Sequence, residues 1–190
     1  MSRSAIAGLL ITTAFVAACG SSTRLVETWR DPAEVPFALN RTLAVFMTTD
    51  AGARRIVEDQ LAARLPGGVA SYRVIPDDSS LNGESVRQAV TAGHFDGAVT
   101  LRVVSVTPEV SSLQNTDFYG YWGYWRSAYD PLAYTASTVY SVQSTLHSFR
   151  DGKLVWTGNI DTIDPKNTKK LASRSAKATV KGLKNNGYMR

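Results

Sequence analysis

Residues 42–65 read TLAVFMTTDAGARRIVEDQLAARL, and this stretch indicates the fold class. It opens with a short apolar run of the kind that forms a buried strand. Asp50 can cap the helix that follows, and Pro66-Gly67-Gly68 can end it. In that helix, apolar residues recur at every fourth position: Ala53, Val57, Leu61 and Leu65. A buried strand followed at once by an amphipathic helix predicts a βα unit with a parallel neighbouring strand.

The pattern downstream extends this unit. Residues 70–75 predict a second strand, and Asn82 can cap a second helix that stops near Gly93. Residues 97–106 alternate apolar and polar side chains, with a phase slip at Val104 that predicts a β-bulge. Strands joined by helices in this way are expected to be parallel, through right-handed crossovers.

The last third of the chain predicts antiparallel pairing. Residues 134–149 alternate as a half-buried strand does, and Asp151-Gly152 predicts a hairpin turn into residues 153–163. Asp164-Pro165 predicts the start of a last helix, because a cap followed by Pro is a helix-start signal. We therefore expect one α/β (α+β) domain over residues 25–190. Its mixed sheet would follow the order β-α-β-α-β, then an antiparallel β-hairpin and a C-terminal helix.

The N-terminus has the pattern of a processing signal. Arg3 is followed by an apolar run over residues 5–18, which is too short to span a bilayer core. The run ends in Val16-Ala17-Ala18-Cys19, and this ending resembles the bacterial lipobox. The resemblance implies that residues 1–18 are a lipoprotein signal peptide and that Cys19 is the acylated N-terminus of the mature chain. An ordinary signal peptide followed by an incidental cysteine is the alternative.

An acylated Cys19 would replace a transmembrane helix, since each buried methylene of a diacylglycerol or palmitate chain contributes about 0.8 kcal/mol. Residues 19–24 would then be a lipidated tether to the bilayer. No Asp follows Cys19. By resemblance to the sorting rule of Gram-negative lipoproteins, this favours the outer membrane, with the domain facing the periplasm. Nucleic acid is not expected as a partner, because export separates the protein from it.

Two further segments accompany the lipobox. Residues 24–32 read RLVETWRDP, and residues 152–158 read GKLVWTG. Together with an insertion at about 111–133, this arrangement resembles the uncharacterised bacterial envelope lipoproteins built around a domain of unknown function. The resemblance implies a fold in agreement with the one above and brings no catalytic residues. From its own residues, the first segment predicts a strand that tucks Trp29 into the sheet and turns at Asp31-Pro32; a recognition patch is the alternative.

The insertion is rich in aromatic residues. Phe118 and Tyr134 bound a segment that holds eight aromatic side chains. Rings exposed on a loop can stack on sugars, enter the headgroup region of a bilayer or anchor a protein partner. Packing of the loop on its own domain is the alternative. The residues expected to contact an envelope protein or a glycan are Tyr119, Tyr121, Trp122, Tyr124, Trp125 and Arg126.

The positive charge is concentrated in the last helix. The whole chain has a net charge of +5, whereas residues 164–190 alone contain eight basic residues and one acidic residue. Without acidic neighbours these cations repel one another, so they suit contact with anionic lipid or another polyanion. A solvated helix face is the alternative. The residues expected to line one strip are Lys170, Arg174, Lys177 and Lys181.

Catalytic patterns are weak. The chain has two His and one Cys without ligand spacing, so we expect no metal and no cofactor. No nucleophile elbow, Walker-type phosphate loop or dinucleotide fingerprint occurs. Four carboxylates could serve an enzyme that acts on glycans if two of them shared a cleft: Asp77, Asp78, Asp117 and Asp130.

These features favour a non-enzymatic lipoprotein of the bacterial cell envelope that acts as a binding or scaffolding module. The aromatic insertion, and with it the basic helix, would supply the contact surfaces. An enzyme acting on cell-wall or envelope glycans, with the insertion as a sugar platform, is the alternative. Neither the specific partner nor the oligomeric state follows from these patterns.

Overall fold

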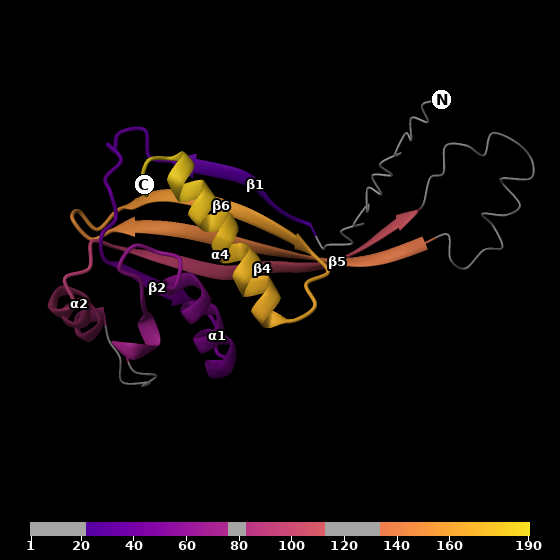
Figure 1. Ribbon diagram of the computed structural model, residues 1–190, viewed down its shortest axis with the longest axis horizontal. Coiled ribbons are helices and arrows are strands. Elements are labelled where there is room, and N and C mark those ends of the chain that lie inside the picture. The colour runs from indigo at the N-terminus through magenta and orange to yellow at the C-terminus, as the bar shows by residue number, and fades with distance from the viewer. Residues whose placement is uncertain (1–21, 76–82, 113–133) are drawn as a thin grey trace, which may run out of the picture.

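The central sheet is mixed and has the strand order β1-β6-β5-β4-β2-β3 (Figure 1). The computed structural model describes residues 22–75, 83–112 and 134–190. In this part of the chain the strands are β1 Thr23–Arg30, β2 Thr42–Phe46, β3 Val69–Ala70, β4 Gly97–Ser112, β5 Tyr134–Ser148 and β6 Leu154–Ile163. The helices are α1 Ala51–Ala62, α2 Gly83–Ala92 and α4 Thr168–Asn185, with a 3-10 turn at Ser71–Arg73. None of the helices in these ranges is both long and apolar enough to cross a bilayer.

The strand directions confirm the predicted mixed sheet. β2 is parallel to both β3 and β4, while β4, β5, β6 and β1 pair in antiparallel fashion. The register of β4 against β5 shifts between Val103 and Ser105, so the bulge predicted at Val104 is present. Gly152, in the predicted hairpin turn, has a φ of +70°, which glycine adopts without a Cβ penalty. The domain is therefore a single α+β unit, as its sequence predicts.

β3 is shorter than the strand that the sequence predicts over residues 70–75. β3 ends at Ala70, and the chain then enters the 3-10 turn. The backbone N–H of Tyr72 donates to Glu58 Oε2 at 2.9 Å, and Ser71 Oγ donates to Glu58 Oε1 at 2.7 Å. Because a buried carboxylate from α1 takes these donors, the segment turns instead of continuing along the sheet.

The predicted start of the last helix is also wrong. α4 begins at Thr168, and the side chain of Asn167 caps it by accepting from the N–H of Lys170 at 2.9 Å. Asp164 has a φ of +44° and accepts from the N–H of Thr138 at 2.7 Å. Its carboxylate therefore closes the end of the β5–β6 pairing and is not available to cap the helix.

Trp29 is expected to pack into the sheet, but it does not enter the core. It pairs with Thr157 across the β1–β6 ladder and keeps 45% of its surface exposed. Thr157 lies between Trp156 and Gly158, which are buried, so Trp29 is on the opposite face of the sheet. The predicted turn is present, with the N–H of Ala33 donating to Asp31 Oδ1 at 2.9 Å.

The main core lies between one face of the sheet and the helices α1 and α4 (Figure 1). Trp156, on β6, is fully buried there. An ideal Cβ at Gly182 of α4 would lie 2.6 Å from its ring, and one at Gly158 would lie 2.7 Å from it. These two glycines let the helix approach the sheet closely around the indole. A smaller cluster on the other face joins Leu43 and Ala98 to residues that include Val90 of α2.

β4 and β5 extend beyond the helices as a two-stranded arm (Figure 1). Residues 102–109 of β4, which lead into this arm, are all exposed. The arm ends with Ser112 paired to Tyr134, the two residues that flank the aromatic insertion. The insertion therefore begins and ends at the tip of the arm, away from the helical layer.

Candidate functional site

Several of the predicted site residues lie outside the described part of the chain. These are the acylation residue Cys19 and the four carboxylates Asp77, Asp78, Asp117 and Asp130. The aromatic group Tyr119, Tyr121, Trp122, Tyr124, Trp125 and Arg126 also lies outside it. The contact and catalytic roles assigned to these residues remain predictions.

The basic strip of α4 is described in full. Lys170, Lys177 and Lys181 are exposed. Arg174 is half-buried, and its Nη1 is covered without a hydrogen-bond partner among the described residues. Three of the four residues of the predicted strip are therefore exposed, and their contact with anionic lipid or another polyanion remains a prediction.

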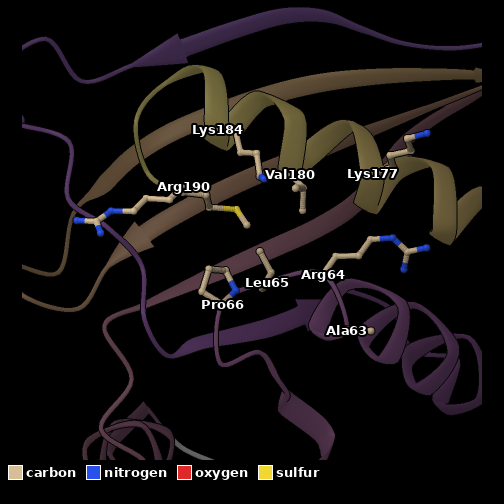
Figure 2. Close-up of a pocket in the computed structure, with 9 residues that line it drawn as sticks. Ala63, Arg64, Leu65, Pro66, Lys177, Val180, Lys184 and Arg190 are labelled. Carbon is tan, nitrogen blue, oxygen red and sulfur yellow. The ribbon is translucent and has the colours of Figure 1, made fainter.

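Lys177 also lies at the edge of an open groove (Figure 2). The groove has a volume of about 550 Å³ and runs between α4 and the loop that follows α1. Four cationic side chains line it: Arg64, Lys177, Lys184 and Arg190. The remaining lining residues are apolar: Ala63, Leu65, Pro66, Val180 and Met189. We call this feature the basic groove; no acidic side chain is among its lining residues.

The helical repeat of α4 explains one wall of the basic groove. Lys177, Val180 and Lys184 are spaced by three and four residues, so they share one side of the helix. Figure 2 shows Val180 and Lys184 pointing from α4 toward Leu65 and Pro66. Val180 also packs partly against the main core, and the rest of the core side of α4 is formed by residues such as Ala176, which is fully buried.

Hydrogen bonds hold the opposite wall. The N–H of Leu65 donates to the carbonyl of Ala62 at 3.2 Å, and Leu65 itself is only 6% exposed. Arg64 donates through Nη1 to the carbonyl of Gln60, and through Nη2 to Ser173 Oγ on α4 at 3.0 Å. Arg64 therefore links the end of α1 to α4 and sets the spacing between the two walls.

Tyr188 fixes the third side, where the chain leaves α4. It is fully buried, and its hydroxyl donates to the carbonyl of Val155 at 3.1 Å. Its ring meets that of Phe37 edge to face, with centroids 5.7 Å apart. Burial raises the pKa of the Tyr188 hydroxyl above its usual range. The adjacent Met189 and Arg190 are thereby held at the rim of the basic groove.

Few of the positive charges in the basic groove are paired with acidic side chains. The ion pairs among the described residues join Arg24 to Asp161, Arg54 to Glu58 and Arg73 to Asp59. No such pair is found in this part of the chain for Lys177, Lys184 or Arg190. The groove therefore combines cationic side chains that have no acidic side-chain partner among the described residues with an apolar floor.

The two histidines lie on separate elements. His94 is exposed after α2 with a φ of +50°, and His147 is half-buried on β5, paired with Ala98. Within the described ranges, no group of three or more His, Cys, Asp or Glu side chains could hold a metal ion.

Sequence reasoning missed three cations of the basic groove. Lys184 lies seven residues after Lys177, so the same face could have been extended by two helical turns. Arg64 and Arg190 lie near Lys177 and Lys184 only because of tertiary packing. No local sequence pattern indicates that these four residues share a surface.

Comparison with known proteins gave no family. No protein-family profile matches the chain, and no curated protein sequence does. The resemblance to envelope lipoproteins therefore remains a prediction.

Three solved structures show remote similarity. PelC from Paraburkholderia phytofirmans, described as a dodecamer, aligns with a TM-score of 0.46 and 14% identity over 90% of this chain and 99% of PelC. Lipoprotein GNA1162 from Neisseria meningitidis gives a TM-score of 0.38 and 14% identity over 77% and 99% of the two chains. A PDZ domain protein from Parabacteroides distasonis gives a TM-score of 0.38 and 10% identity over 87% of this chain and 36% of that protein. Similarity at this level says nothing about activity or assembly.

Proposed function

We propose that the protein is a non-enzymatic, lipid-anchored module of the bacterial cell envelope that binds or scaffolds an envelope partner. Its acylated Cys19 would sit in the outer membrane, with the domain facing the periplasm. The observation that carries the proposal is the position of Cys19 relative to the first hydrogen bond of the described part of the chain. Ser22, three residues after Cys19, already accepts a hydrogen bond through its carbonyl from the N–H of Ile163 at 3.0 Å.

This contact limits how far the domain can move from its anchor. Three extended residues span at most about 10 Å. The ends of β1 and β6 would therefore stay close to the lipid headgroups, so a module without a long linker would work at the membrane surface. The long β4–β5 arm supports a contact role as well, since the insertion with Trp122 and Trp125 starts from its tip.

Two experiments test the proposal separately. Metabolic labelling with a palmitate analogue should mark the native chain and leave Cys19→Ala unlabelled, and the labelled chain should fractionate with outer membranes. Equal labelling of both chains, or no labelling of either, would overturn the proposal that Cys19 is acylated. Photo-crosslinking from positions 122 and 125 in living cells should capture one reproducible envelope component. Position 151, exposed in the turn that follows the far end of β5, is the matched control.

A further inference from the structure

We propose that the basic groove is a binding site for a lipid with an anionic head group, in which Lys177, Lys184 and Arg190 contact the head group and the apolar floor receives the first part of an acyl chain. The site is formed by residues of the folded domain alone. It does not require an acylated Cys19, so this proposal and the proposed function can fail independently.

The charge of the groove selects an anion. Lys177, Lys184 and Arg190 are exposed and have no ion pair among the described residues. Each of these cations attracts a negative group that approaches the groove. Lysines near an anionic lipid surface are each attracted to it appreciably, and the attraction falls off within a Debye length.

The floor of the groove selects an amphiphile. Pro66, Val180 and Met189 are half-buried and present apolar surface between the cations, whereas Leu65 is only 6% exposed and contributes little. Figure 2 shows Leu65 and Pro66 lying between Arg190 at one end and Arg64 at the other. The lining contains no aromatic ring on which a sugar could stack and no neutral hydrogen-bonding side chain. Covering this floor with hydrocarbon removes apolar area from water, whereas a small hydrophilic anion would leave it exposed.

The groove is also held in place before any ligand arrives. Arg64 is hydrogen-bonded to both walls, through Gln60 and Ser173, and Tyr188 fixes the segment that carries Arg190. A preorganised site loses less conformational entropy on binding. The groove is open on one side and has a volume of about 550 Å³.

The test uses the full chain in a neutral detergent and native mass spectrometry with added lipids. Phosphatidylglycerol should bind about tenfold more tightly than phosphatidylcholine with the same acyl chains, because only the former is a net anion. Glycerophosphoglycerol, the same head group without acyl chains, should not bind measurably. Equal binding of the two lipids, or tight binding of the free head group, would overturn the proposal.

Variants locate the site. Lys177→Gln/Lys184→Gln should weaken phosphatidylglycerol binding by at least about tenfold, because two of the cations that favour an anionic head group are removed. Lys170→Gln/Lys181→Gln removes the same charge from exposed positions of the same helix outside the lining, and should change binding less than about twofold. An equal loss in both pairs would show general attraction to the basic helix and would reject the groove. All four positions are exposed, and circular dichroism would verify that each pair folds.

Discussion

Arg54 and Glu58 form a buried ion pair within α1, with Nε and Oε1 3.0 Å apart. Glu58 is fully buried, and each of its oxygens accepts hydrogen bonds from outside the helix. The donors are the N–H of Phe46 on β2 and the groups of Ser71 and Tyr72 after β3. One carboxylate therefore connects α1 to both parallel strands at that edge of the sheet.

Removing this carboxylate should destabilise the fold strongly. Glu58→Ala leaves the donors of Phe46 and Tyr72 buried and takes the anion from Arg54. Breaking a buried pair from one side costs about 3–5 kcal/mol. We expect a loss of this size in the free energy of unfolding, measured by urea denaturation. Asp59→Ala removes the neighbouring exposed partner of Arg73 and serves as the control, with a much smaller expected effect. Equal losses would mean that the buried network does not stabilise the domain.

Gly182→Ala should disturb the packing of α4 on the sheet. The new Cβ would lie 2.6 Å from Cζ2 of Trp156, which has no room to move because it is fully buried. Overpacking of this kind costs about 1–3 kcal/mol, although Ala favours a helix more than Gly does. The expected result is a lower melting temperature. Lys181→Ala, at the exposed neighbouring position, should leave it nearly unchanged. A Gly182→Ala chain as stable as the native one would contradict the close approach.

Asn167→Ala should lower stability by about 1 kcal/mol, because the side chain caps α4 through the N–H of Lys170. Pro165→Ala should have little effect, since Pro165 precedes the helix and is not its first residue. Chemical denaturation of both variants measures the difference. A larger loss for Pro165→Ala would place the helix start at Asp164-Pro165 after all.

Tyr188 should make the protein lose stability in alkali. Its pKa is raised in the folded state by burial, so the neutral form is favoured there. This contribution is complete below the pKa of the unfolded tyrosine, about 10, and is lost as the pH rises toward the folded pKa. Unfolding free energies measured between pH 9 and 11, a window chosen around that unfolded pKa of about 10, should fall with pH. In Tyr188→Phe the fall should be shallower, and an identical slope would contradict the assignment.

Local patterns predicted most of the elements. The helix after Asp50 is present, with the predicted cap: Asp50 Oδ1 accepts from the N–H groups of Gly52 and Ala53. The bulge at Val104 and the hairpin at Gly152 are also present. These features depend on residues close together in the sequence, so periodicity and capping rules can predict them.

The errors arose where a distant group competes with a local signal. Residues 70–75 have strand-like composition, but Glu58 takes the N–H of Tyr72. Asp164 has the chemistry of a helix cap, but the N–H of Thr138 takes its carboxylate. Trp29 and Trp156 are equally apolar, and only the position of α4 decides that Trp156 is the buried one.

The sequence by itself determined the order of strands and helices, the mixed character of the sheet and the concentration of positive charge in the last helix. It determined these because they depend on side-chain periodicity and composition along a continuous segment. Only the tertiary structure decided which cations share a surface. Lys177 and Lys184 meet Arg64 and the apolar floor because α1 and α4 pack side by side on one face of the sheet, and that contact joins residues more than 100 positions apart.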